Sequence, residues 1–521
     1  MRRIFWLFAL GATSGVTFVP PPPPKENHRS VLILGGGVAG IIAARTLHEQ
    51  GIDDFMIVEA RDELGGRLRS KQLGADNRRV TVELGANWIQ GTQEENGPAN
   101  PILTLARRHG LKAAESDFYD SMTTYDETGQ VDYLNVFNKA VADYTILTIA
   151  GGERVQRKQV DSTCRTGYSI IGAKPRTPHE MVSEYYMVRE LYLRFDHKLI
   201  SITDWEYAQT PEKTSWIASS WASASICPCA NNFTYDVDQG GFSDGNLFSI
   251  DQRGFKHFIQ AEAATFLTPE QTLLNATVRN IAHSADGVVV TLTDRTNITA
   301  DYAITTFSIG VLQNDDVLFE PPLPTWKQEA IQSMTMGTYT KIFLQFADKF
   351  WFDTQFALYA DRERGRYPVW QGLDLENFMP GSGIVFATVT GDYSQRIERM
   401  SDAEVQAEVL EVLRTMFPNT TIPTPTAFFF PRWFSDPLYR GSFSNWPSGF
   451  VSPHHTNIRA NIGQRLWFAG EGTSQKYFGF LHGAYFEGLD IGKRVANCLN
   501  TGNCASLPFT EEVLSATPYV A

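Results

Sequence analysis

The chain has 521 residues, of which 43% are hydrophobic and 20% are charged. A chain of this size and composition buries large cores and forms two or more domains, which excludes a disordered or membrane-embedded polymer. The net charge of −13 argues against nucleic acid as a partner and suits a cationic substrate, because a negative field concentrates cations near the surface.

The chain begins with the form of a secretory signal peptide. Arg2 and Arg3 precede an apolar run, residues 4–12, that is too short to span a bilayer. We assign residues 1–19 to the signal peptide and 20–29 to a stiff proline-rich linker; the alternative is a disordered or membrane-anchoring start. Loss of the two arginines changes the net charge from −13 to −15, and no later stretch has the length and apolarity of a spanning helix.

The first folded unit is predicted from the stretch VLILGGGVAGIIAARTLHEQG, which gives an apolar strand, glycines at 35, 37 and 40, and a helix ending near Gly51. A second apolar strand, FMIVE, closes on Glu59, which lies 19 residues after Gly40. In a dinucleotide-binding βαβ unit such a carboxylate binds the adenosine ribose, and the glycines let the backbone approach the pyrophosphate.

The next segment favours FAD over a nicotinamide cofactor. EARDELGGRLRS supplies Gly65, Gly66 and Arg67, a second flexible loop and a guanidinium for a long, doubly charged cofactor. Without the preceding βαβ pattern, this segment would be interpreted as an arginine-bearing surface turn. ELGANWIQG follows, and by itself it is typical of a glycine bend with Trp88 packed into a core.

Two stretches in the middle of the chain combine charge with aromatic residues. In DWEYAQTP, Glu206 lies between Trp205 and Tyr207; it is either an exposed acid on a loop or a receptor for an ammonium group. In TYTKIFLQF, strand alternation places Lys341 on an otherwise aromatic face. Lys341 therefore lies either at a sheet edge, reaching water, or in a wet internal site.

A second cofactor loop is predicted about 400 residues after the first. LWFAG is an apolar strand, Glu471 follows at its carboxyl end, and a glycine-rich turn leads into a helix from about His482. His482 opens this helix and is interpreted as structural, with a catalytic base as the alternative. The sheet must therefore be assembled from distant parts of the chain.

Several features predict an oxidising compartment. Cys498 and Cys504, two of five cysteines, enclose five residues and could form a small disulfide loop, while the odd count leaves at least one thiol unpaired or intermolecular. No Cys/His spacing resembles a zinc site, so we predict no metal. With the leader, sequons indicate a glycoprotein that is secreted or resident in the secretory pathway: Asn232, Asn275, Asn297 and Asn419.

Together these motifs resemble the flavin-containing amine oxidases, most closely secreted polyamine oxidases of the plant type. The resemblance rests on GGGVAG, EAR, GGR, ELGANWIQG, DQRGFKHFI, YTKIFLQF, PRWFSDPLYRGSFSNWP and WFAGEGTS with HGAY, and it covers residues 30–500. It implies an α/β fold, with a discontinuous Rossmann-like FAD-binding domain and an α+β substrate-binding domain with a mixed sheet. We place the FAD-binding domain at 30–97, 245–310 and 440–500, the substrate-binding domain at 98–244 and 311–439, and a C-terminal tail at 501–521.

The resemblance also implies roles for individual residues. It gives Lys341 the catalytic role of holding a water near the reactive flavin nitrogen. It assigns FAD binding to Gly35, Gly37, Gly40, Glu59, Arg67, the backbone of Val278, Trp433 and Glu471. It places around the substrate tunnel Trp88, Gln90, Glu206, Tyr207, Tyr339, Phe443 and Phe480.

The implied reaction is oxidation of spermine, spermidine or their acetylated forms at a secondary amine. FAD accepts a hydride, the imine is hydrolysed to an aldehyde and an amine, and dioxygen regenerates the flavin with release of hydrogen peroxide. The implied partners are a small-molecule amine and O2, with no nucleic acid, no membrane after leader removal, and a monomeric state.

Three positions depart from the family pattern and leave the substrate open. Gln90 is a neutral amide where a carboxylate is common, Phe480 lacks a frequent hydroxyl, and Gly472 replaces a bulkier residue. Loss of a charge-assisted contact costs about 1.5–3 kcal/mol. Acetylated polyamines, shorter diamines and a bulkier alkaloid-like amine of a biosynthetic pathway therefore stay open as substrates. A non-catalytic polyamine-binding protein is a further alternative, against which Lys341 and both cofactor loops argue.

Overall fold

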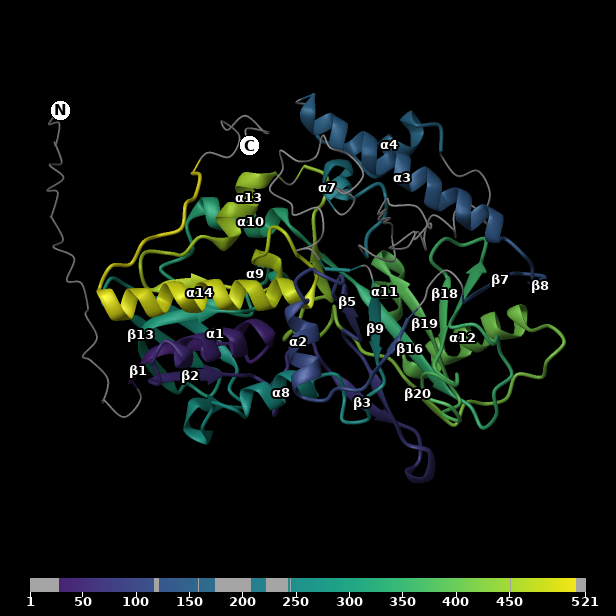
Figure 1. Ribbon diagram of the computed structural model, residues 1–521, viewed down its shortest axis with the longest axis horizontal. Coiled ribbons are helices and arrows are strands. Elements are labelled where there is room, and N and C mark those ends of the chain that lie inside the picture. Colours follow the sequence, from purple (N-terminus) through teal and green to yellow (C-terminus); the bar gives the residue numbers. More distant parts are fainter. Residues whose placement is uncertain are drawn as a thin grey trace, which may run out of the picture.

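Two large β-sheets organise the chain, one at each end of the longest axis (Figure 1). The computed structural model describes residues 28–116, 121–157, 159–173, 208–221, 242–243, 245–449 and 451–511. The predicted leader, most of the linker, Glu206, Tyr207, Asn232 and two cysteines, Cys227 and Cys229, lie outside these described residues.

The first sheet carries the predicted βαβ unit. Its strands are β1 (His28–Leu34), β2 (Phe55–Val58), β10 (Thr272–Leu273), β11 (Val278–His283), β12 (Val288–Leu292), β13 (Asn297–Thr305), β14 (Leu318–Glu320) and β22 (Leu466–Phe468). Their order is β10-β2-β1-β13-β12-β11-β14, with β22 also paired to β13. At its centre the sheet is parallel, and Ile33 of β1 pairs with Ile57 on one side and Ile304 on the other.

Both faces of this sheet are covered. Val31 and Ile33 of β1 belong to one hydrophobic core, while Leu32 and Leu34 belong to the core on the opposite face. This is the pattern of a parallel strand buried on two sides. It confirms the predicted strand at 31–34.

Two helices from opposite ends of the chain pack together on one face of the sheet. The helix α1 (Val38–Glu49) follows β1, and α14 (Leu481–Thr501) runs alongside it (Figure 1). Their backbones approach so closely that a Cβ on Gly488 would collide with the carbonyl oxygen of Ala39. The predicted helix start near His482 is confirmed. Cys498 and Cys504, whose pairing the sequence left open, form a disulfide.

The second sheet positions Lys341. Its strands are β7 (Met122–Asp126), β8 (Gly129–Gln130), β16 (Tyr339–Gln345), β17 (Phe356–Ala360), β18 (Val369–Gly372), β19 (Ile384–Thr390) and β20 (Ala427–Phe429). It is mixed, because β7 and β17 are parallel whereas the other pairs are antiparallel. One face packs Ile342 and Leu344 into a core with α12 (Asp402–Met416), beside α11 (Gly391–Glu398).

The remaining elements connect the two sheets and cover them. The small sheets are β3 (Ser70–Leu73) with β4 (Val80–Glu83), β9 (Asn246–Ser249) between β5 (Trp88–Gln90) and β6 (Ala113–Glu115), and β15 (Thr335–Gly337) with β21 (Phe443–Asn445). The other helices are α2 (Pro101–Arg108), α3 (Leu134–Gln156), α4 (Cys164–Ile170), α7 (Trp216–Trp221), α8 (His257–Ala263), α9 (Ile309–Leu312), α10 (Thr325–Ser333) and α13 (Ser452–Arg459). Short 3-10 helices are η2 (Asp76–Arg78), η5 (Pro269–Gln271) and η6 (Glu471–Thr473).

One strand lies beyond a predicted domain limit. The prediction ends the second segment of the FAD-binding domain at 310, yet β14 pairs with β11 and extends the first sheet to residue 320. No pattern in the sequence marks this pairing, because β14 is three residues long and half exposed.

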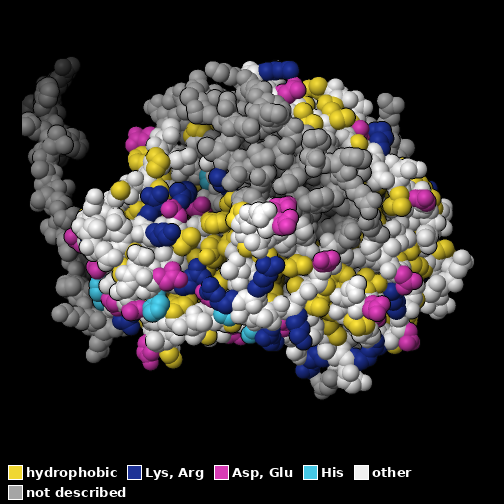
Figure 2. All heavy atoms as spheres, in the orientation of Figure 1, with side chains coloured by type: hydrophobic (Ala, Val, Ile, Leu, Met, Phe, Trp, Pro, Cys, Tyr) yellow, Lys and Arg dark blue, Asp and Glu magenta, His cyan; other side chains and the backbone are white. Residues whose placement is uncertain are grey.

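Charge is distributed over the surface rather than gathered on one side of the drawn face. Figure 2 shows acidic and basic side chains of the described residues lying among one another. Among the helices that the structure describes, none is long and apolar enough to cross a membrane.

Candidate active site

The glycine loop after β1 offers bare backbone to a ligand. Gly35 has a φ of +116°, a conformation that favours glycine, and a Cβ on Gly40 would collide with the carbonyl oxygen of Gly35. Gly37 caps α1 without a side-chain hydrogen bond, and the first turn of α1 has no acidic residue. The N–H groups at this helix end are therefore suited to bind an anion such as a pyrophosphate.

Glu59 lies at the carboxyl end of β2, beside the same loop. Its carboxylate accepts hydrogen bonds from the backbone N–H of Gly36 at 2.7 Å and of Arg61 at 2.9 Å. These contacts fix its orientation at the edge of the sheet, where a dinucleotide-binding unit places the ribose.

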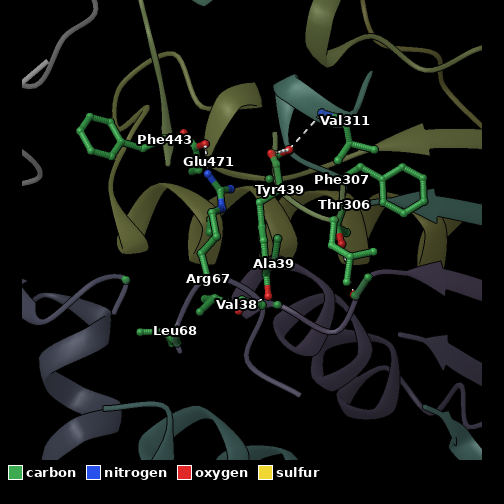
Figure 3. A pocket seen from close by; sticks show the side chains of 18 of the residues that line it. Val38, Ala39, Arg67, Leu68, Thr306, Phe307, Val311, Tyr439, Phe443 and Glu471 are labelled. Atoms are coloured by element: carbon green, nitrogen blue, oxygen red, sulfur yellow. Dashed lines mark hydrogen bonds and ion pairs between the residues drawn. The ribbon is translucent and has the colours of Figure 1, made fainter. Parts of the chain in front are cut away.

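The second predicted loop touches the first. A Cβ on Gly66 would lie 3.0 Å from the Cα of Gly37, so the two backbones are in close contact. Arg67 then reaches Glu471, and the guanidinium and carboxylate form an ion pair at 2.7 Å (Figure 3). Glu471 also accepts from the backbone N–H of Gly479 at 2.7 Å, so it joins the N-terminal and C-terminal cofactor segments.

A cavity of about 560 Å³ connects these segments with the second sheet. The predicted FAD-binding residues that line it are Gly35, Gly37, Glu59, Arg67, Val278, Trp433 and Glu471. The predicted substrate and catalytic residues that line it are Trp88, Gln90, Tyr339, Lys341, Phe443 and Phe480. Gly40 is not part of the lining; it permits the close packing of α1 on the loop.

Aromatic side chains dominate the end of the cavity near Lys341. The indole N–H of Trp88 donates to Ser116 Oγ at 3.1 Å, and the ring packs edge-on against Phe248. Tyr339 and Phe443 lie with their ring centroids 6.0 Å apart. Such faces attract a cation and exclude water from an amine.

Lys341 lies inside the protein and not at a sheet edge. It is 2% exposed, and its Nζ donates to the carbonyl oxygens of Gly85 at 2.7 Å and Glu83 at 3.2 Å. Burial lowers the pKa of Lys341 to about 7, while the negative charge of Glu83 acts in the opposite direction. Near neutral pH this amine can therefore both hold and release a proton.

The segment ELGANWIQG lines the cavity and also contributes Leu84 and Ile89 to hydrophobic cores. Gly85 passes so close to Arg67 that a Cβ would collide with the Arg67 carbonyl oxygen. Asn100 Nδ2 donates to the carbonyl oxygen of Gln90 at 2.9 Å and lies 3.4 Å from His482 Nδ1. Trp88 and Gln90 are each half-buried, and the Trp88 indole both packs against two hydrophobic cores and lines the cavity.

The packing around residue 472 explains why this chain has glycine where the family usually has a bulkier residue. A Cβ at this position would collide with Cγ1 of Ile309, which occupies the space of a side chain.

His482 is buried, stacks on Phe480 with ring centroids 5.1 Å apart, and also lines the cavity.

Several lining residues carry no signal in the sequence. Thr306, Lys476 and Tyr477 line the cavity, yet each is an isolated polar or aromatic residue without diagnostic spacing. Tyr439 also lines it and lies within the motif PRWFSDPLYRGSFSNWP, but no role was predicted for it. Among the described residues, no three His, Cys, Asp or Glu side chains gather as a candidate metal site. The described sequon asparagines, Asn275, Asn297 and Asn419, are all exposed.

Residues 38–496 match the model of the family described as flavin containing amine oxidoreductase, and the chain belongs to this family. It is a flavin-dependent amine oxidase.

Plant polyamine oxidases are similar in sequence to this protein over most of its length. Polyamine oxidase 1 of Zea mays is 35% identical over 493 residues, which cover 90% of this chain and 91% of that protein. Polyamine oxidase 7 of Oryza sativa subsp. japonica is 35% identical over 480 residues, covering 87% and 92%. The solved structure of wild-type putrescine oxidase bound to putrescine has a TM-score of 0.66 at 16% identity, covering 89% of this chain and 98% of its own, and shows the same fold.

The residues present fit FAD. The open N-terminus of α1 and the carboxylate of Glu59 suit the pyrophosphate and ribose, and they lie at one end of a single cavity. Lys341 and the aromatic side chains line the same cavity, where the reactive ring of a long cofactor would meet a substrate.

Proposed function

We propose that this enzyme oxidises a polyamine, spermine, spermidine or an acetylated form, at a secondary amine. The observation that carries the proposal is the single cavity that joins two dinucleotide loops to an aromatic chamber around the buried amine of Lys341. The names of the plant relatives support the same substrate class.

The chain's own residues would prepare the substrate. Gly35, Glu59 and Arg67 would hold FAD, which when bound supplies the hydride acceptor. Trp88, Tyr339, Phe443 and Phe480 would enclose the alkyl chain and strip water from the reacting nitrogen, which must be neutral to lose a hydride from its neighbouring carbon. Lys341 Nζ, anchored by two carbonyl oxygens, would hold a water and exchange a proton with it.

Peroxide release from purified enzyme tests the proposal. Spermine, spermidine, their N1-acetyl forms, putrescine and a cyclic secondary amine should be compared, with product masses determined for each. We expect turnover of the polyamines with formation of an aldehyde and a shorter amine. Putrescine as the only substrate would contradict the proposal.

A second candidate substrate class is favoured by Gln90. This neutral amide lines the cavity, so the chain lacks a carboxylate at that position for a distal ammonium. Consumption of a cyclic secondary amine, with spermine and spermidine untouched, would instead identify an amine or imine oxidase of a biosynthetic pathway.

We further propose that the enzyme is a secreted, monomeric glycoprotein that uses O2 to regenerate its flavin. The leader-like sequence at 1–19, the disulfide between Cys498 and Cys504 and three exposed sequon asparagines support secretion. The mature N-terminus, the mass shift on glycosidase treatment and the mass in solution test these points. A retained leader with unmodified asparagines would argue against secretion.

A further inference from the structure

The amine of Lys341 is held by a short segment that begins at the last residue of β4. Its two carbonyl partners, Glu83 and Gly85, are two residues apart. The position of this segment therefore decides where the amine lies in the cavity.

The side chain of Glu83 anchors this segment. One carboxylate oxygen accepts from the backbone N–H of Phe255 at 2.8 Å, and the other accepts from Ser70 Oγ at 2.7 Å. Glu83 is 5% exposed, and burial raises its pKa while the two hydrogen bonds act in the opposite direction. Gly254 must be glycine here, because it has a φ of +92° and a Cβ would collide with Ser70 Oγ.

A second buried lysine serves as an internal comparison. Lys327 is 0% exposed and, like Lys341, donates to two backbone carbonyl oxygens, those of Ile458 and Ala460. Burial alone lowers the pKa of Lys327 well below its ordinary value, whereas Glu83 opposes the shift at Lys341. Of these two lysines, Lys341 is the one beside a carboxylate whose negative charge opposes the effect of burial.

The other charged side chain that acts on Glu83 is Lys256. Among the described residues, Glu83 is the one charged side chain that shifts the pKa of Lys341. Glu83 also faces Lys256, whose Nζ is paired with Glu63 at 2.5 Å. The negative charge of Glu83 therefore acts on both lysines, of which Lys256 has a second acidic partner in Glu63.

We propose that Glu83 is a positioning residue for Lys341: its backbone carbonyl orients Nζ, and its fixed carboxylate holds a proton on that amine. This inference rests on the proposed role of Lys341 in amine oxidation. Glu83 acts through Lys341 and its side chain is directed to Ser70 and Phe255.

Glu83→Gln separates charge from structure. The glutamine keeps both contacts, since its oxygen can accept from Phe255 N and its amide can donate to Ser70 Oγ. We expect FAD to stay bound and the inflection in the pH dependence of flavin reduction to move to lower pH by about one unit, because an opposite charge nearby shifts a pKa by about that much. An unmoved inflection would overturn the inference.

Glu398→Gln is the matched control. Glu398 is also a buried carboxylate, and it accepts from the backbone N–H groups of Phe434 and Ser435 at 3.1 and 2.9 Å. It contacts Thr340, which precedes Lys341 on β16 but faces the opposite side of the sheet. We expect the inflection in the pH dependence of flavin reduction by Glu398→Gln to match that of the wild type. A shift equal to that of Glu83→Gln would overturn a specific role for Glu83.

A double-mutant cycle tests the pair without measuring activity. Unfolding of the FAD-loaded wild type, Glu83→Gln, Lys341→Met and the double variant should be followed at pH 6.5 and pH 9. We expect the single changes to be non-additive at the lower pH, where Lys341 is charged, and close to additive at the higher pH. Additive changes in the free energy of unfolding at both pH values would overturn the inference.

This design separates the two possible failures. If Lys341→Met leaves flavin reduction unchanged while the cycle shows pH-dependent coupling, the proposed catalytic role of Lys341 fails and the Glu83–Lys341 pairing stands. If Lys341→Met slows flavin reduction and the cycle shows no coupling, the role of Glu83 fails and the proposed function stands.

Discussion

At the scale of single residues, Lys341 combines burial with a pKa of about 7. We expect Lys341→Met to slow flavin reduction or reoxidation about a hundredfold, the usual contribution of a proton-transferring group, while FAD stays bound. Rapid mixing with amine and with O2 measures the two half-reactions. Lys213→Met, a change at an exposed lysine, is the control, and unchanged kinetics in Lys341→Met would remove Lys341 from the mechanism.

Gln90 is the residue that bears most directly on substrate charge. We expect Gln90→Glu to lower the KM for spermine about tenfold or more, since a charge-assisted contact contributes about 1.5–3 kcal/mol. Gln93→Glu adds the same charge to the same loop at an exposed position outside the cavity lining and should leave KM unchanged. An equal KM for spermine in wild type and Gln90→Glu would show that Gln90 does not face the distal amine.

At the scale of elements, the contact between α1 and α14 depends on a missing side chain. We expect Gly488→Ala to push the helices apart, because its Cβ would collide with the Ala39 carbonyl oxygen, and to lower the free energy of unfolding by about 1–3 kcal/mol. The FAD content should fall too, since Ala39 lies in the first turn of α1. Urea unfolding and flavin absorbance measure both effects.

The matched control is Asn500→Ala, an exposed change on the same helix. Both changes raise helix propensity, so a stability loss in Gly488→Ala and not in Asn500→Ala isolates the α1–α14 contact. Equal effects of the two changes on the free energy of unfolding would contradict the prediction.

At the scale of the whole molecule, the cofactor site is assembled from three distant parts of the chain. Arg67 and Glu471, 404 residues apart, meet in one ion pair, and Val278 lines the same cavity. We therefore expect removal of FAD to lower the melting temperature, and re-addition at about a hundred times Kd to restore about 2.7 kcal/mol. Thermal unfolding with and without FAD checks this, and identical melting temperatures would contradict it.

Acid stability should reflect a buried histidine away from the cavity. Burial lowers the pKa of His455 to about 3, so below about pH 6.5 the unfolded chain binds a proton that the folded chain does not. Stability contributed by neutral His455 is thus lost as pH falls from about 6.5 to about 3. We expect His455→Gln to flatten the pH dependence of the free energy of unfolding in this window; a slope equal to that of the wild type would be the contrary result.

Local patterns were enough to predict much of the fold. Val31 to Gly40 predicts β1 and α1, and LWFAGEG predicts β22 and the loop before α14, because glycine spacing and apolar runs are properties of neighbouring residues. The strand alternation in TYTKIFLQF likewise predicts that Lys341 shares a face with Tyr339 and Phe343, apart from Ile342 and Leu344.

The sequence by itself determined the dinucleotide-binding unit, the cofactor class and the residue types at the site, since each depends on short-range spacing. Only the tertiary structure decided that Lys341 is buried and anchored to Glu83 and Gly85, and that Gly488 meets Ala39. It also decided that Ile309 fills the space beside Gly472. These contacts join residues far apart in the chain, and their energies depend on burial and distance, which no local pattern encodes.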